Sequence, residues 1–268
     1  MGNMYSHSKL STFEQCRLKF KYRYIDKIKT TSTSIESFLG KIVHDTLQWL
    51  YLKIKSKEKI PTIDELIKYY ADRWQENYKQ DIIIVKKTLT TKDYFNKGVE
   101  FLINYYTKNH PFDDNTLEVE KRIVITFGES GGYIIQGFID RLVYNLKKDE
   151  YEIHDYKTSN FLPTQESLDN DRQLALYSLA IKDLFGKDKN VALIWHFLAH
   201  NIKIHSRRTN EQLEQLKNET IELIKKIEST TEFPSNKSTL CDWCEYNSIC
   251  SEFKKQPSEN QEELDIWG

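Results

Sequence analysis

Two acidic residues and a lysine lie on what the sequence predicts to be one β-hairpin. Segments rich in β-forming residues, Gly132 to Tyr144 and Glu150 to Tyr156, flank a short polar stretch typical of a turn. If Lys147-Lys148 forms the tip, Asp140 and Asp155 face each other across the two strands. Like charges in such a pair destabilise a sheet, and a divalent cation between them would remove that cost.

Magnesium suits this pair because it is a hard ion that takes one or two carboxylates and keeps several waters. Lys157 is predicted to share a strand face with Asp155, since strand side chains alternate with a period of two. Its ammonium could then orient a metal-bound water or offset phosphate charge. The alternative is a solvated hairpin whose charges face water, because an Asp-x-Lys triplet is common.

The segment Gly-Phe-Ile-Asp-Arg from Gly137, followed after a gap by Ile-His-Asp-Tyr-Lys-Thr-Ser, closely resembles the motif of PD-(D/E)XK nucleases of the RecB and AddB type. The resemblance implies a DNA nuclease in which Asp140 and Asp155 hold Mg or Mn. It also implies that Lys157 positions or activates the attacking water. In similar enzymes the backbone carbonyl corresponding to Tyr156 adds a metal ligand.

Two residues outside the hairpin could complete a metal site. Neutral imidazole binds divalent ions, manganese more readily than magnesium, which makes His44 a candidate ligand. Gly40 to His44 matches a Gly-x-x-x-His motif that the RecB and AddB family carries on a helix ahead of the sheet, where the histidine is a metal ligand. Related nucleases often have a further acid on the strand before the hairpin. We assign that role to Glu120, with Glu118 as the competitor.

Gln173 and Tyr177 are four residues apart on a predicted helix after the hairpin, so they share one helix face. The pair resembles the Gln-x-x-x-Tyr motif that follows the catalytic lysine in this nuclease family and contacts the active site or the DNA. The resemblance therefore places both residues among the catalytic ones.

Three of the four cysteines, Cys241, Cys244 and Cys250, cluster near the C-terminus, and Cys16 lies far upstream. In a chain expected to stay in the cytoplasm, such clustering indicates metal binding rather than disulfides. Structural zinc and a 4Fe-4S cluster both use four thiolates, and the residues alone do not separate the two.

The stretch Ser-Thr-Phe-Glu-Gln-Cys-Arg-Leu-Lys-Phe from Ser11 is similar to the N-terminal cysteine helix of AddB-like nucleases and of CRISPR-associated exonucleases. In those proteins one cysteine before the nuclease core and three after it hold an iron–sulfur cluster, so the resemblance favours 4Fe-4S over zinc. Arg17 stands where the family usually has proline, a departure that leaves the ligand unchanged. Such a cluster would join the two chain ends, and its binding energy would be folding energy.

The elements that position these residues follow from periodicity and capping signals. We expect helices at about 12–24, 34–53, 62–80, 94–108, 171–184 and 209–227, and strands at 117–127, in the hairpin, and at 191–198 and 202–206, with a polar loop at 160–170. This order predicts an α/β fold: a restriction-endonuclease-like core, with a small central mixed sheet flanked by helices, plus an N-terminal helical region and a C-terminal Cys cluster. The expected divisions are residues 1–115 (helical region), 116–230 (nuclease core), 231–253 (Cys-cluster region closing on Cys16) and 254–268 (flexible acidic tail).

The net charge of -1 gives no sign of a nucleic-acid partner, but the charge distribution does. Residues 1–60 contain 12 Lys or Arg and 5 Asp or Glu, which predicts a basic wall facing phosphates, with an ordinary solvated helix surface as the alternative. No apolar run approaches the length of a membrane span, and the N-terminus lacks the apolar segment of a signal peptide. We therefore expect a cytoplasmic protein with no membrane partner.

Gln261, Leu264 and Trp267 at the C-terminal end resemble the glutamine-leucine-aromatic peptide with which replication and repair enzymes bind sliding clamps. Gly268 replaces the usual second aromatic residue. The competing interpretation is a disordered acidic end.

Taken together, these features predict a metal-dependent deoxyribonuclease, an exonuclease acting on single-stranded DNA ends. The family resemblance implies a role in DNA repair, recombination or CRISPR adaptation. Two alternatives remain open at this point: a catalytically silent nucleic-acid-binding or assembly subunit on the same fold, and a zinc-stabilised adaptor.

Overall fold

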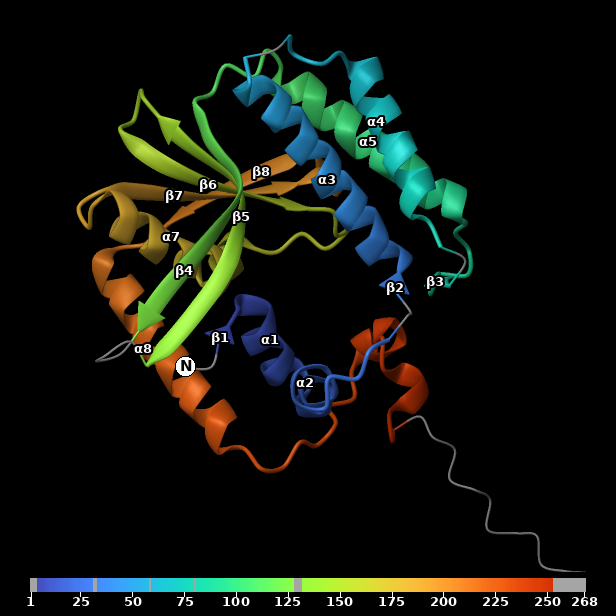
Figure 1. Cartoon of the computed structure of the whole chain (residues 1–268), viewed down its shortest axis with the longest axis vertical. Coiled ribbons are helices and arrows are strands. Elements are labelled where there is room, and N and C mark those ends of the chain that lie inside the picture. Colours follow the sequence, from blue (N-terminus) through green and yellow to red (C-terminus); the bar gives the residue numbers. More distant parts are fainter. Residues whose placement is uncertain (1–3, 31–32, 58, 80, 128–131, 253–268) are drawn as a thin grey trace, which may run out of the picture.

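The computed structural model describes residues 4–30, 33–57, 59–79, 81–127 and 132–252 (Figure 1). Its elements in chain order are β1 (Met4–Tyr5), α1 (His7–Gln15), α2 (Arg17–Phe20), the π-helical turn η1 (Lys21–Ile25), β2 (Thr33–Ser34), α3 (Ile35–Lys55), α4 (Ile63–Asn77), β3 (Ile82–Ile83), α5 (Thr91–Asn109), β4 (Thr116–Phe127), β5 (Tyr133–Asn145), β6 (Glu150–Lys157), α6 (Gln165–Asp169), α7 (Arg172–Phe185), β7 (Asn190–Phe197), η3 (Leu198–His200), β8 (Ile202–Arg207), α8 (Asn210–Ser229), η4 (Thr239–Trp243) and η5 (Asn247–Ile249).

A mixed six-stranded sheet lies at the centre of the fold. Its strand order is β1-β5-β6-β7-β8, in which β1 and β6 pair with different stretches of the same edge of β5. The strand β4 pairs with the opposite edge of β5. The β4–β5, β5–β6 and β7–β8 pairs are antiparallel, whereas β6–β7 and β1–β5 are parallel. The fold class expected from the sequence, a small mixed sheet flanked by helices, is confirmed.

The predicted hairpin is present with the expected register. Arg141 pairs with His154, and the ladder continues to Asn145 opposite Glu150. The side chain of Asn145 accepts hydrogen bonds from the backbone N–H groups of the two tip lysines at 3.1 and 3.2 Å, which stabilises the turn. The β5–β6 ladder ends one pair before Asp140 and Asp155, so both aspartates lie where the two strands begin to separate.

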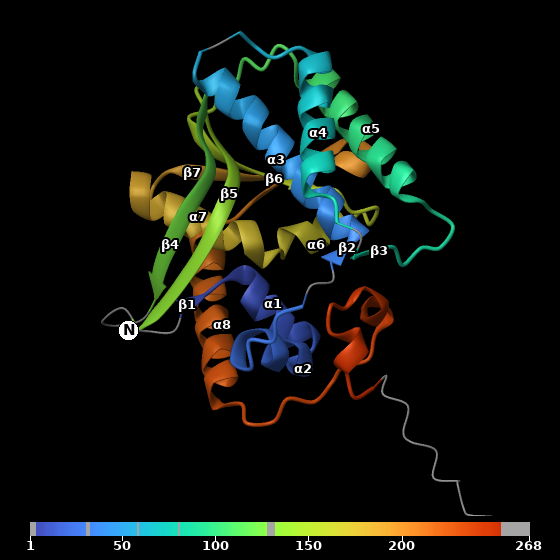
Figure 2. The ribbon, with the colours of Figure 1, turned by 45° about the vertical axis from the view of Figure 1, so that its right-hand side comes forward.

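Helices cover both faces of the sheet (Figures 1 and 2). The helices α3, α4 and α5 form one layer, and their apolar side chains make a cluster that includes Tyr156 of β6. A second cluster on the other side joins α1, α2, α7 and α8 to Ile139, Ile153 and Trp195 of the sheet. The long helix α3 forms because Ser34 caps its first turn and buried residues recur at helical spacing from Ile35 to Tyr51.

The two ends of the described chain pack together below the sheet (Figure 2). Leu18 N donates to Pro234 O at 3.2 Å, and the rings of Phe20 and Phe233 stack with centroids 6.4 Å apart. The hydroxyl of Tyr246 donates to Ile28 O at 3.1 Å. These contacts bring the segment of Cys16 beside that of the other three cysteines.

Two expected elements differ from the structure. The N-terminal helix begins at His7, because Ser6 caps it by accepting from Lys9 N at 3.1 Å. It ends at Gln15, because the next residue, Cys16, is extended and caps α2 with its own sulfur. The expected polar loop at 160–170 contains the one-turn helix α6, capped by Thr164.

The remaining expected helices and strands are confirmed, with ends shifted by no more than three residues. Among the described residues, none of the helices combines the length and apolar character needed to span a bilayer. The predicted tail at 254–268, with Gln261, Leu264 and Trp267, lies outside the described residues.

Candidate functional site

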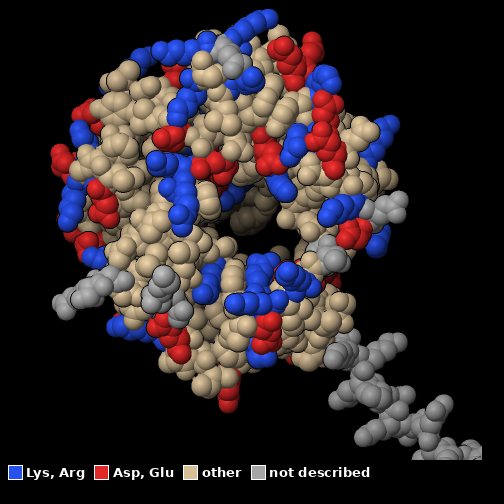
Figure 3. Space-filling view, in the orientation of Figure 1, with Lys and Arg blue, Asp and Glu red and all other residues tan. Residues whose placement is uncertain are grey.

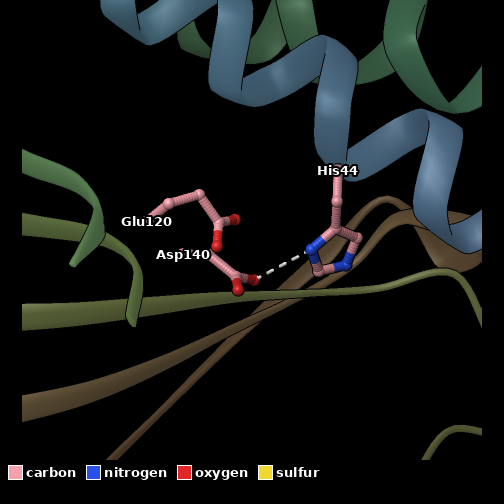
Figure 4. A group of neighbouring side chains, drawn as sticks. All are labelled: His44, Glu120 and Asp140. Atoms are coloured by element: carbon pink, nitrogen blue, oxygen red, sulfur yellow. Dashed lines mark ion pairs between the residues drawn. The ribbon is translucent and has the colours of Figure 1, made fainter. Parts of the chain in front are cut away.

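Three predicted metal ligands from three elements converge beside the sheet. His44 of α3, Glu120 of β4 and Asp140 of β5 each offer one ligand atom, and these atoms lie within 4.8 Å of one another (Figure 4). The β4–β5 register explains the two acids, because the pairs Val119–Arg141 and Lys121–Ile139 leave Glu120 opposite Asp140.

Glu120, and not Glu118, faces this group. Glu120 has a left-handed backbone with φ of 50°, whereas Glu118 lies 2.7 Å from Lys55 Nζ and 3.7 Å from Lys121 Nζ in exposed ion pairs. Burial and then the Asp140 carboxylate raise the pKa of Glu120 to about 6, with His44 acting in the opposite direction. A cation would relieve this repulsion.

His44 binds two other predicted ligands at once. Its Nδ1 lies 3.3 Å from Asp140 Oδ2, and its Nε2 lies 2.7 Å from the backbone oxygen of Tyr156. Burial alone would lower the pKa of His44, but the hydrogen bond and charge of Asp140 raise it to about 9.

Gly40 explains the Gly-x-x-x-His spacing. One turn before His44, a Cβ at Gly40 would lie 3.1 Å from Thr158 Oγ1, directly after β6. The glycine lets α3 approach the end of this strand closely, and the approach brings His44 to Tyr156.

Asp155 and Lys157 form a second unit with Gln173 of α7. Lys157 Nζ lies 2.8 Å from Asp155 Oδ2 and donates to Gln173 Oε1 at 3.0 Å, while Gln173 Nε2 donates to Asp155 Oδ1 at 3.1 Å. Burial raises the pKa of Asp155 to about 6 despite the nearby ammonium, and Asp140 adds to the increase. Burial opposes the charge on Lys157, but Asp155 raises its pKa above the usual range.

The two units meet at Tyr156, whose backbone N–H donates to Asp140 Oδ2 at 2.9 Å and whose carbonyl faces His44. Asp155 differs from the three grouped ligands because its oxygens face Gln173 and Lys157. Tyr177, one turn after Gln173, is buried with its ring against Gly137, where a side chain would overlap it. The structure therefore brings every predicted residue of the hairpin, α3 and α7 into one region.

Sequence comparison identifies the family. A model of the PD-(D/E)XK nuclease superfamily matches residues 4–251. The chain belongs to this superfamily.

Solved structures resemble this PD-(D/E)XK chain at low identity. A protein from Eubacterium rectale named as a candidate exonuclease is similar over 91% of this chain and 88% of its own, with 11% identity and a TM-score of 0.50. A protein named SSO0001 is similar over 95% of this chain and 89% of its own, with 12% identity and a TM-score of 0.44. At such identity the first likeness supports the fold alone. A search of curated proteins found no match.

PD-(D/E)XK nucleases use divalent metals, and the donor set of this chain fits one. Carboxylates, a carbonyl oxygen and an imidazole suit Mg or Mn, whereas soft ligands are absent from this group of described residues.

A buried arginine connects β5 and β6 beside this site and was not predicted. Arg141, next to Asp140, is 1% exposed. Its Nε donates to the Tyr156 hydroxyl at 3.1 Å, its Nη2 to His154 Nδ1 at 2.9 Å and its Nη1 to Thr116 Oγ1 at 3.2 Å, and it forms an ion pair with Asp114. Arginine is usually exposed, so the sequence alone predicts that Arg141 faces solvent. Only its place in the family motif could have indicated its importance.

The histidines around Arg141 predict a pH-dependent stability. Burial is the main cause that lowers the pKa of His154, and the nearby Arg141 lowers it further. Burial is also the main cause that lowers the pKa of His196, and His154 adds to this effect. The unfolded state therefore binds more protons below about pH 6.5, and stability falls with decreasing pH by up to about 1.4 kcal/mol per pH unit for each histidine. We expect His196→Phe to flatten the fall between pH 6.5 and 5, measured by urea unfolding. An unchanged slope would show that His196 is not the titrating group.

The four cysteines line one cavity between α2 and the C-terminal turns. All four are free thiols, and Cys16 and Cys241 accept backbone N–H groups at 3.5 and 3.3 Å. Within the described part of the chain, only His44, Glu120 and Asp140 place three ligand atoms within 4.8 Å. The fold therefore brings all four cysteines to one place, although Cys16 lies far upstream in the sequence.

Proposed function

We propose that this PD-(D/E)XK protein is a Mg- or Mn-dependent deoxyribonuclease that degrades single-stranded DNA from its ends. The observation that carries the proposal is the joint placement of two units around Tyr156: the ligand group of His44, Glu120 and Asp140, and the Asp155–Lys157 pair.

Each residue has a role that follows from its contacts. A divalent ion at this site supplies charge stabilisation on the phosphate and a more acidic water. His44, Asp140, Asp155 and the Tyr156 carbonyl would hold it, with Glu120 binding it or its waters. Lys157 holds a proton beside Asp155 and can orient the attacking water.

Gln173 and Tyr177 act from α7 in this proposal. Gln173 fixes Lys157 and Asp155 relative to each other through hydrogen bonds to both. The ring of Tyr177 fills the space left by Gly137 and fixes the strand that carries Asp140.

The charge of the surface supports a nucleic-acid substrate. The space-filling view shows an opening between the part of the molecule formed by α3 and the sheet and the part formed by α1 and α2 (Figure 3). Lys and Arg side chains gather along its α1–α2 side, as the basic N-terminal region led us to expect. Such a basic rim suits a phosphate backbone.

A strand-end assay tests this proposal. We expect the protein with Mn to shorten linear single-stranded DNA labelled at either end and to leave a circular single strand intact. Equal degradation of the circle would overturn the exonuclease assignment. No cleavage of any DNA with Mg or Mn would favour the main alternative, a catalytically silent nucleic-acid-binding or assembly subunit.

We also propose that Cys16, Cys241, Cys244 and Cys250 hold a 4Fe-4S cluster that joins the chain ends, with zinc as the alternative. The four thiols line one cavity, and the pattern of one cysteine before the nuclease core and three after it, which resembles that of AddB-like nucleases, favours the 4Fe-4S cluster. The same proposal divides the chain into a helical region (1–115), a nuclease core (116–230), a Cys region (231–253) and a tail (254–268). It also includes a cytoplasmic location and a role in repair, recombination or CRISPR adaptation. Binding of a sliding clamp by the tail is a weaker part of it.

Removal of one cluster ligand has a measurable consequence. We expect Cys244→Ala to bleach the brown colour of anaerobically purified protein and to lower the free energy of unfolding, because cluster binding is coupled to folding. Ile249→Ala, an exposed neighbour, is the control. A colourless wild type containing zinc would contradict the iron–sulfur assignment.

A further inference from the structure

Phe138 is an aromatic side chain placed beside the metal ligands with half of its surface in solvent. It is 51% exposed, although its strand neighbour Ile139 is buried. It makes no ring–ring contact with the other aromatic side chains of the described residues, whereas Phe20 and Phe38, for example, pack against several rings. Packing within the protein therefore does not account for this phenyl ring.

The ring faces the site because of strand alternation. Phe138 and Asp140 are two residues apart on β5, and both line an open groove of about 560 Å³. His44 and Glu120 line the same groove, and Lys41 of α3 forms part of its opposite wall. A phosphate at the metal ligands would thus have Phe138 directly beside it.

An arginine accompanies the ring on the same face. Arg122 of β4 is the cross-strand partner of Phe138 and is exposed. Its Nη2 donates to Gln136 Oε1 at 3.1 Å. The guanidinium is therefore held toward the cross-strand pair of β4 and β5 that contains Gln136, on the side away from Asp140. Beside the metal ligands, the face therefore presents an exposed ring and, on the adjacent strand, an exposed cation.

We propose that Phe138 and Arg122 form a nucleotide subsite next to the scissile phosphate, an inference that rests on the proposed nuclease function. Phe138 stacks on the base of the adjoining nucleotide, and Arg122 contacts its phosphate. Stacking tolerates any base sequence because every base has a π-face. It requires an unpaired base, so the subsite selects a single strand or a frayed end at the point of cleavage. The strand then follows the exposed face of the β4–β5 ribbon.

Kinetics on end-labelled single-stranded DNA test the ring. We expect Phe138→Leu to raise KM roughly tenfold, the loss of one stacked base, while Phe138→Trp stays near wild type. Leu146→Ala, which removes a more exposed apolar side chain at the hairpin tip, is the matched control. Because Phe138 is exposed, thermal unfolding should be the same in all four proteins.

Two binding readouts distinguish stacking from a general loss of activity. In a Lys157→Met background, a single-stranded probe with 2-aminopurine next to the bound phosphate should change fluorescence on binding, and Phe138→Leu should abolish that change. Arg122→Gln should reduce the slope of log affinity against log salt by about 0.7, the value for one phosphate contact on a single strand.

The outcomes separate this inference from the nuclease proposal. Unchanged KM and fluorescence in Phe138→Leu, with a wild type that cleaves DNA, would overturn the subsite and leave the nuclease proposal standing. A wild type that cleaves no DNA with either metal would overturn both.

Discussion

Replacing Lys157 by methionine is expected to reduce DNA cleavage by roughly 10²–10³-fold or more, the usual effect of removing one preorganised charge from an active site. The side chain keeps its length but can no longer hold a proton 2.8 Å from Asp155 Oδ2 or donate to Gln173. The loss should appear in kcat, because the ammonium acts where charge develops. Single-turnover cleavage of an end-labelled strand measures it.

The control for this substitution lies on the same hairpin. Lys148 at the tip lies 3.6 Å from Glu150 Oε1 and is largely exposed, so Lys148→Met should cleave at the wild-type rate. Circular dichroism should show folded protein for both variants. Wild-type turnover by a folded Lys157→Met protein would remove the catalytic assignment of this lysine.

Replacing Arg141 by leucine is expected to give the largest loss of stability, about 3–5 kcal/mol, because removing one partner leaves buried polar groups uncompensated. The Tyr156 hydroxyl and His154 Nδ1 would each lose the guanidinium as a donor, and Asp114 would lose its ion pair. Since the backbone of Tyr156 binds Asp140 and His44, cleavage should also fall in any fraction that folds. Urea unfolding measures the change in free energy.

Arg122 provides a matched arginine for that experiment. It is exposed on the neighbouring strand. Because it is exposed, Arg122→Leu should change the free energy of unfolding by no more than about 0.5 kcal/mol. An Arg141→Leu variant as stable as Arg122→Leu would show that the buried network contributes little to folding.

The hairpin was the part of the site most accessible from sequence. A polar turn between two β-forming segments limits the register to few choices, and the chosen one placed His154 opposite Arg141, as observed. With that register, strand alternation was enough to bring Lys157 to Asp155. The fold class followed from the order of helices and strands for the same reason: local patterns carry it.

Other features depended on tertiary contacts that no local pattern encodes. The choice of Glu120 over Glu118 rests on a left-handed backbone at one residue and on distant Lys55, which binds Glu118. The break at Cys16 opposes a continuous amphipathic pattern, and the burial of Arg141 opposes the usual exposure of arginine. The short strand β1 pairs with β5 through only two residues, too few for a sequence signal.

The most direct test of the account is a metal titration of cleavage. Protein freed of divalent ions is mixed with end-labelled single-stranded DNA, and Mn is added in steps. We predict no cleavage in chelator and a saturable return of cleavage with Mn, requiring more metal when His44 is replaced by alanine. Cleavage that persists in chelator, or none at any Mn or Mg concentration, would contradict the assignment of this site as a metal-dependent nuclease centre.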